Sequence, residues 1–123
     1  MNPSALLLIA HGSRRPEANA DLEQLAERLR GDFAMVQPSY LELCEPSIVH
    51  GGTLCVQAGA KCVILLPYFL SAGVHVVEDL TAARDELSRK HAEAEFLLAK
   101  PLGLHPLLVE VVKARAREVL PVA

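Results

Sequence analysis

Two continuous apolar stretches most constrain how this chain can fold. One covers residues 5–10 (ALLLIA), and the other is the segment CVILLPYFL, residues 62–70. Neither alternates with polar residues, so each predicts a β-strand that is covered on both faces. Both are far shorter than the roughly 20 apolar residues that a membrane-spanning helix needs. The two stretches therefore predict a parallel β-sheet buried between helices.

Amphipathic segments separate these strands and give the order of elements. Further strands are expected within residues 35–43 and 95–100, and helices within 16–31, 46–58, 76–87 and 105–120. On the last helix, one face carries Leu108, Val111, Val112 and Val119. The βαβαβαβα order with short connections predicts a doubly wound, mostly parallel four-stranded sheet with helices on both faces, as in flavodoxin-like folds. A single α/β domain, residues 1–123, is expected.

Three residues weaken parts of this assignment. Pro38 lies near the start of the second expected strand, where it cannot donate a ladder hydrogen bond. Gly51 and Gly52 lie inside the second expected helix, which glycine destabilises. Gly59 is expected to end that helix.

Composition excludes several classes of protein. Apolar residues make up 51% of the 123 residues and charged residues 22%, a globular balance. The formal net charge of −3 provides no basic field for nucleic acid. The first apolar stretch is too short for a signal peptide and no charged segment precedes it. We therefore expect a cytoplasmic protein with no nucleic-acid or membrane partner.

The three cysteines, Cys44, Cys55 and Cys62, contain no C-x-x-C pair and leave one cysteine over. This argues against a disulfide framework and against a thiolate zinc site. We expect them to pack as small apolar side chains in a reducing compartment.

Two histidines stand just beyond expected strands. His11 follows the first strand and His75 the third, while Glu42 lies near the end of the second. Ligands of such sheets bind beyond the carboxyl ends of the strands. If the first and third strands are neighbours, these side chains face one crevice and form an open divalent-metal site. Alternatively, each histidine is a hydrogen-bonded turn residue. Surface or capping positions are expected for His50, His91 and His105.

Charged residues flank both histidines. Arg14 and Arg15 follow Ser13 beside an expected helix N-terminus, where guanidinium groups and free backbone N–H groups bind anions. They could equally be a solvated charge pair. Asp79 lies one helical turn after the second histidine and could orient that imidazole. Alternatively, Asp79 and Glu78 only complement the helix dipole in the first turn.

Three segments carry a resemblance to a known family: LLLIAHGSRRPEAN, YLELCEPSI and LLPYFLSAGVHVVEDL. In this order and spacing, the sequence resembles the small class II chelatases of the CbiX and SirB type, which insert cobalt or iron into sirohydrochlorin. The likeness runs from about Leu6 to the final helix. Its most specific part is AHGSR together with G-V-H-x-x-x-D.

The resemblance implies a function and its residues. His11 and His75 would be metal ligands and catalytic residues, and Glu42 the acidic residue of the active site. The metal, Co²⁺, Fe²⁺ or Ni²⁺, is a substrate, and no organic cofactor is implied. Neutral imidazoles hold a metal without adding charge. His11, His75 or Glu42 would accept the pyrrole protons.

The substrate and the assembly follow from the same likeness. Sirohydrochlorin is a tetrapyrrole with carboxylates around its rim, which a chain of net negative charge must meet with local cations; Ser13, Arg14 and Arg15 are the candidates. The product would enter cobalamin or sirohaem biosynthesis. A chain of single-domain length resembles the short forms that assemble as homodimers.

Other functions compete with this interpretation. Phosphoglycerate-mutase-like phosphatases also place His-Gly after their first strand, but they have arginine where this chain has Ala10. A non-catalytic divalent-metal carrier would use the same two histidines and leave the tetrapyrrole unchanged. A regulatory flavodoxin-like module would need an acidic cluster at the strand ends, which the first strand does not supply.

Overall fold

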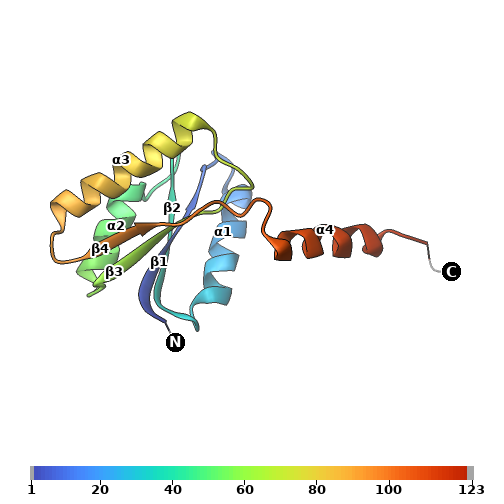
Figure 1. The fold of residues 1–123 in the computed structure, drawn as a ribbon, viewed down its shortest axis with the longest axis horizontal. Coiled ribbons are helices and arrows are strands. Elements are labelled where there is room, and N and C mark those ends of the chain that lie inside the picture. The colour runs from blue at the N-terminus through green and yellow to red at the C-terminus, as the bar shows by residue number, and fades with distance from the viewer. Residues whose placement is uncertain (1, 122–123) are drawn as a thin grey trace.

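A four-stranded parallel sheet organises residues 2–121, the part of the chain that the computed structural model describes (Figure 1). The elements in chain order are β1 (Asn2–Ala10), α1 (Pro16–Leu29), β2 (Phe33–Tyr40), α2 (Ile48–Gln57), β3 (Cys62–Pro67), α3 (Val74–Lys90), β4 (Glu95–Leu98) and α4 (Pro106–Glu118). The strand order is β2-β1-β3-β4, and each pair is parallel. The predicted doubly wound sheet is confirmed, with the first and third strands as neighbours.

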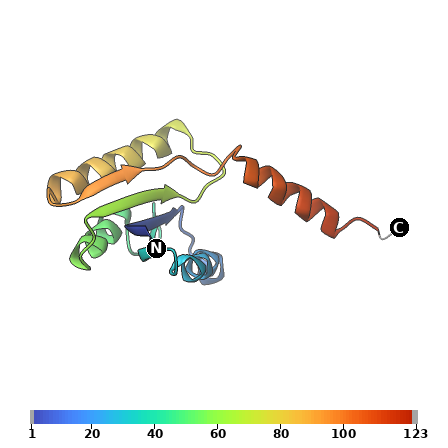
Figure 2. The same cartoon turned by 60° about the horizontal axis from the view of Figure 1, so that its bottom comes forward.

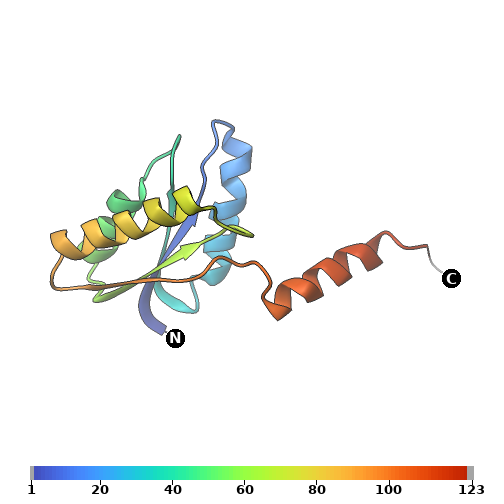
Figure 3. The same ribbon diagram turned by 45° about the horizontal axis from the view of Figure 1, so that its top comes forward.

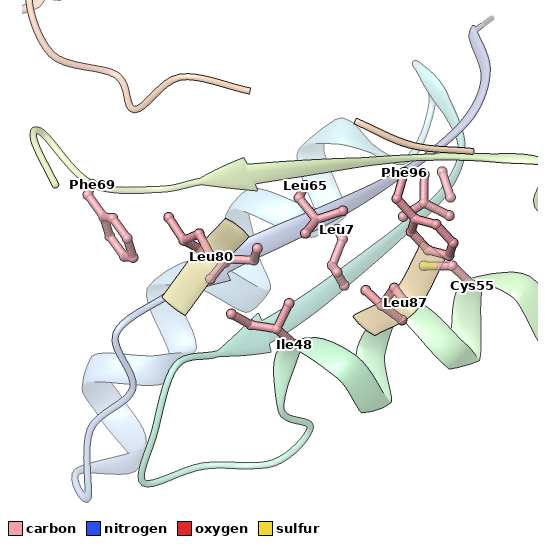
Figure 4. Packing of buried hydrophobic residues seen from close by; sticks show 11 residues of the cluster. Leu7, Ile48, Cys55, Leu65, Phe69, Leu80, Leu87 and Phe96 are labelled. Carbon is pink, nitrogen blue, oxygen red and sulfur yellow. The ribbon is translucent and has the colours of Figure 1, made fainter. Parts of the chain in front are cut away.

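The two faces of β1 are buried under different helices. Leu7 belongs to a core cluster that includes Leu80 and Leu87 of α3, together with residues of α2 (Figure 4). Leu6 belongs to a second cluster, with Leu22 of α1 on the opposite face. Because successive side chains of a strand point to opposite faces, β1 needs apolar residues at every position. This explains its continuous apolar run.

The two glycines inside α2 lie where the helix approaches its neighbours too closely for a side chain. A Cβ at Gly51 would lie 1.8 Å from Ser39 Oγ, and one at Gly52 would lie 2.6 Å from a methyl carbon of Leu87. The close packing against β2 and α3 thus offsets the low helix propensity of glycine. Pro38 lies inside β2, which is tolerated because β2 is an edge strand.

Several element boundaries differ from the predicted ones. β2 ends at Tyr40, so Glu42 lies in the loop that follows the strand. α3 begins at Val74, and its first turn contains no acidic side chain. The prediction that Glu78 and Asp79 complement the helix dipole in that turn is therefore wrong. Gly59, with φ of 103°, directly follows the C-cap of α2, as expected.

The cysteines are free, as expected. Cys55 is fully buried, and burial raises the pKa of its thiol to about 11, so the side chain stays neutral and behaves as a small apolar group. Within residues 2–121, no helix has both the length and the apolar character that crossing a membrane requires.

The position of α4 corrects the expectation of a helix packed on the sheet. In each view α4 projects away from the sheet and the other helices (Figures 1, 2 and 3), and none of its residues is buried. The connection between β4 and α4 is hydrogen-bonded to the loop that follows β3, where the Leu102 N–H donates to the Phe69 carbonyl at 2.9 Å. The chain is therefore directed away from the sheet before α4 begins.

Candidate active site

The carboxyl ends of the four parallel strands share one edge of the sheet, and the predicted site residues lie along it. His11 directly follows β1, Glu42 lies two residues beyond β2, and His75 lies in the first turn of α3. Because β1 and β3 are neighbours, the two segments that carry the histidines leave the sheet from adjacent strands.

Backbone hydrogen bonds join the loop after β1 to the loop after β2. The Glu42 N–H donates to the His11 carbonyl at 3.1 Å. Gly12 has φ of 98°, and a Cβ there would lie 2.0 Å from the Glu42 carbonyl oxygen. Glycine is required on both grounds, since other residues rarely adopt this conformation. The Gly12 turn thus keeps the backbones of His11 and Glu42 in contact.

The His11 ring is supported by an aromatic residue that the sequence interpretation missed. It stacks on Phe69, with ring centroids 4.3 Å apart and an interplanar angle of 26°. Phe69 is only 6% exposed and lies in the loop between β3 and α3 (Figure 4). The Tyr68 N–H donates to the Ile9 carbonyl at 2.7 Å, which attaches the start of this loop to β1. The loop that leads to His75 is therefore fixed against His11.

His75 itself is almost fully exposed. Its side chain is 97% accessible, and Nδ1 lies 4.0 Å from a carboxylate oxygen of Glu78. Within residues 2–121, the carboxylate that pairs with this ring is therefore that of Glu78 rather than that of Asp79. The orienting role of Asp79 stays a prediction. The same residues contain no group of three or more His, Cys, Asp and Glu side chains placed to hold a metal. The approach of His11, His75 and Glu42 to one metal ion also stays a prediction.

A second unpredicted contact joins the first two loops. The Asn19 side chain accepts a hydrogen bond from the Ser13 N–H (3.1 Å) and donates one to the Ser13 carbonyl (2.8 Å). It also donates to Cys44 Sγ at 3.0 Å, and this thiol donates to the Ser13 carbonyl at 2.9 Å. An asparagine in the first turn of a helix gives no such signal in the sequence, because its partners are chosen by the fold. Asn19 and Cys44 hold the backbone of Ser13 in place.

A hollow of about 600 Å³ lies beside this network. Ser13 and Arg14 line it, together with the acidic residues Glu23 and Glu45 and with Tyr40. Burial, with smaller contributions from Glu23 and Cys44, raises the pKa of Tyr40, so its hydroxyl stays protonated. The charges around Arg14 are therefore mixed.

The other proposed anion-binding groups remain exposed. Arg15 is the N-cap of α1, and its backbone N–H donates a hydrogen bond to Ser13 Oγ at 3.1 Å. Across residues 2–121, neither Arg14 nor Arg15 forms an ion pair. Their binding of carboxylates stays a prediction.

The three remaining histidines lie at surface or capping positions, as expected. His105 caps α4, and its ring accepts a hydrogen bond from the Leu107 N–H at 3.1 Å. His91 is the C-cap of α3; its ring is largely buried and lies 3.0 Å from Thr53 Oγ1. His50 is exposed.

Taken together, the fold and this edge define a doubly wound parallel α/β domain with a histidine beyond each of its two central strands. A family model described as CbiX matches residues 5–119. The chain therefore belongs to the CbiX family.

Individual relatives agree with this membership. The chain is 36% identical to the chloroplastic sirohydrochlorin ferrochelatase of Arabidopsis thaliana over 94% of its own length and 52% of that protein. It is 31% identical to the sirohydrochlorin cobaltochelatase of Sulfolobus acidocaldarius, over 95% of its own length and 93% of that protein. The chain also superposes on the crystal structure of the sirohydrochlorin chelatase SirB from Bacillus subtilis subspecies spizizenii in complex with cobalt. The TM-score is 0.85 at 25% identity, and the match covers 95% of this chain and 51% of the SirB chain. The chain thus spans about half the length of the first and third of these proteins.

Proposed function

We propose that this protein inserts Co²⁺ or Fe²⁺ into sirohydrochlorin, with release of two protons. One observation carries the proposal: in a chain of the CbiX family, His11 stacks on Phe69, in the loop that leads to His75. Relatives that this chain matches over about half of their length and over nearly all of it are both named as sirohydrochlorin chelatases. The product would enter cobalamin or sirohaem biosynthesis.

In this function the two histidines bind the incoming metal as neutral imidazoles. They contribute no charge and leave coordination positions open for the pyrrole nitrogens. Ni²⁺ also tolerates imidazole ligands and is a third candidate metal. His11, His75 or Glu42 accepts the pyrrole protons, and the contact between the backbones of Glu42 and His11 supports a shared location for these groups.

The macrocycle is wide and flat, and an open sheet edge suits it better than a closed pocket. Arg14 and Arg15 would bind its rim carboxylates, helped by Ser13. Both arginines are exposed and close to His11 in the chain, which supports this assignment. We also propose that the protein is cytoplasmic and acts as a homodimer.

The function is tested by an anaerobic absorbance assay with sirohydrochlorin and Co²⁺ or Fe²⁺, compared with a blank without protein. Wild-type protein should accelerate the spectral change, and His11→Ala and His75→Ala should each return the rate toward the blank. His91→Gln is the matched control, because His91 lies 16 residues from His75 at the other end of α3, about 24 Å away. It should keep the wild-type rate.

The opposite result would identify a different role. If wild-type protein binds Co²⁺ through His11 and His75 but does not exceed the blank, the chelatase function is wrong. A metal carrier would then explain the two histidines.

A further inference from the structure

Lys100 is a cation at the carboxyl edge of the sheet that the proposed function has not used so far. It lies two residues beyond the end of β4 at Leu98, and it is exposed. Across residues 2–121 it forms no ion pair, whereas Lys90 and Lys113 each pair with a glutamate of their own helix. An unpaired ammonium group at this edge is available to an anion that arrives from solvent.

The backbone around Lys100 is fixed against β3 and the loop that follows it. The Ala99 N–H donates to the Leu65 carbonyl at 2.9 Å. The Leu102 N–H donates to the Phe69 carbonyl at the same distance. These two hydrogen bonds lie on either side of Lys100 in the chain, so they hold this residue beside the loop that leads to the second histidine of the edge.

A hollow of about 310 Å³ lies between Lys100 and this loop. Its walls are residues 70–72 of the loop and residues 100, 101, 103 and 104 of the connection to α4. Leu70 and Leu104 are 65% and 95% exposed, so they offer apolar surface to a ligand. A Cβ at Gly103 would lie 2.0 Å from the Leu70 carbonyl oxygen, so the two segments meet as closely as glycine allows.

The charges around this hollow are of one sign. Within the part of the chain that the structure describes, Lys100 is the one charged residue that lines it. The hollow beside Arg14 is different, because Glu23 and Glu45 line it as well. A carboxylate in that hollow meets two like charges, whereas a carboxylate beside Lys100 meets none on the walls.

We propose that this hollow binds one carboxyalkyl side chain of the tetrapyrrole, an acetate or propionate arm, with Lys100 paired to its carboxylate. The methylene groups of the arm pack on Leu70 and Leu104. The inference rests on the chelatase function proposed above and adds a contact with the substrate. The flexible stem of a lysine suits a single carboxylate at the end of a flexible arm.

The strand order supports this position. Because β3 lies between β1 and β4, the first and last of these strands are about 10 Å apart. Arg14 and Arg15 follow β1 and Lys100 follows β4, while the segment that carries His75 leaves the sheet between them. Cations at both places can bind carboxylates on different parts of the rim and keep the centre of the macrocycle near the histidines.

Lys100 also borders a second hollow, of about 370 Å³, whose walls include Leu66 and His105. No described residue of the loop 68–73 lines this second hollow, so it does not adjoin the segment that leads to His75. The first hollow is therefore the one assigned to the substrate, and the experiments below separate the two.

The first test is an anaerobic titration of the protein with metal-free sirohydrochlorin, followed by absorbance. Lys100→Gln should raise the Kd about three- to tenfold, because one charge contact at a partly open site is lost. Lys100→Arg keeps the charge and should bind more tightly than Lys100→Gln. Lys61→Gln is the matched control: it changes the net charge equally, at an exposed position before β3 on the opposite edge, and should keep the wild-type Kd.

A second pair of variants locates the arm. Ser71 lines the first hollow but not the second, and it is exposed. Ser71→Asp places a carboxylate in the first hollow and should weaken binding about as much as Lys100→Gln, whereas neutral Ser71→Asn should not. If Lys100→Gln weakens binding and Ser71→Asp does not, the arm lies outside the first hollow and the inference is wrong. Unfolding in urea should be unchanged for all these variants, because each replaced side chain is exposed.

Steady-state kinetics separate a substrate contact from a role in the chemical step. Lys100→Gln should raise KM for sirohydrochlorin and leave kcat unchanged, because the contact is the same before and during metal insertion. His75→Ala should lower kcat. A fall of kcat in Lys100→Gln without a change of KM would contradict the assigned contact.

The remaining outcomes distinguish this inference from the proposed function. If Lys100→Gln binds the tetrapyrrole as tightly as wild type, the inference is wrong and the chelatase function is unaffected. If binding depends on Lys100 but wild-type protein does not accelerate metal insertion, the chelatase function is wrong and the binding site remains. If wild-type protein does not bind sirohydrochlorin, both are wrong.

Discussion

The segments that carry the two histidines follow neighbouring strands of the sheet, yet the His11 ring is packed against another side chain and the His75 ring is exposed. In the first junction, residues 11–15 between β1 and α1, the His11 ring is stacked on buried Phe69 and the backbone is fixed by Gly12 and Asn19. In the second junction, residues 68–73 between β3 and α3, the chain is anchored at its start, but His75, which follows the junction in the first turn of α3, is 97% exposed.

This difference teaches how one edge can combine a fixed and an accessible group. A ring held by packing keeps its position without a ligand, which lowers the entropy lost on binding. An exposed ring is open to a metal that arrives from solvent. On the proposed function, His11 is the fixed ligand and His75 the accessible one. Substitutions in the two junctions should therefore differ in their effect on stability while agreeing in their effect on activity.

The largest effect is expected from Phe69→Ala, which removes the side chain shared by the two junctions. Truncation of a buried phenylalanine costs about 3–5 kcal/mol, and this one also removes the support of His11. Urea unfolding should show the loss. Tyr68→Ala, at a neighbouring side chain that is 41% exposed, should cost clearly less. Equal losses for the two variants would mean that Phe69 does not anchor the junctions.

Next comes a pair of glycine substitutions, one in each junction. Gly12→Ala must adopt the left-handed conformation and displace the Glu42 carbonyl, at a combined cost of about 3 kcal/mol. Gly73→Ala has a negative φ and no atom within 4 Å of the new Cβ, so less than about 1 kcal/mol should be lost at this N-cap. Thermal unfolding compares the two. Similar melting temperatures would contradict the contrast between the junctions.

A smaller effect is expected from Asn19→Ala, which leaves the Ser13 N–H and carbonyl without their side-chain partner. Loss of such partners costs about 1–3 kcal/mol at partly buried sites. Gln24→Ala, at an exposed position of the same helix, should change the unfolding free energy by less than about 0.5 kcal/mol. If both variants unfold alike in urea, the Asn19 contacts do not stabilise the first junction.

The smallest effects on stability belong to the histidines themselves. His11→Ala loses a stacked ring pair, worth about 0.5–1.5 kcal/mol, whereas His75→Ala should stay within about 0.5 kcal/mol of wild type. Both should nevertheless lose chelatase activity in the absorbance assay. An active and fully stable His75→Ala variant would remove His75 from the site and leave only the first junction functional.

Much of this fold and part of its edge could be predicted from local pattern. The apolar run of β1 indicates a strand buried on both faces, and Gly59 ends α2 where expected. His11 and His75 could be placed beyond adjacent strands because a parallel sheet brings all carboxyl ends together. The carboxylate that lies near His75 could not be predicted in the same way. Glu78 and Asp79 both lie about one helical turn after His75, and only the direction of the side chains selects Glu78.

The sequence by itself determined the order of strands and helices, the parallel sheet and the edge at which the histidines lie, because these depend on the periodicity of apolar residues along short segments. Tertiary structure alone decided the rest. Phe69 supports His11, Asn19 holds Ser13, and two glycines fit α2 against its neighbours only because segments distant in the chain meet at fixed distances. The direction of α4 is of the same kind. The sequence places apolar residues along one side of α4, but the contacts of its connection with the loop after β3 decide that this side does not cover its own sheet.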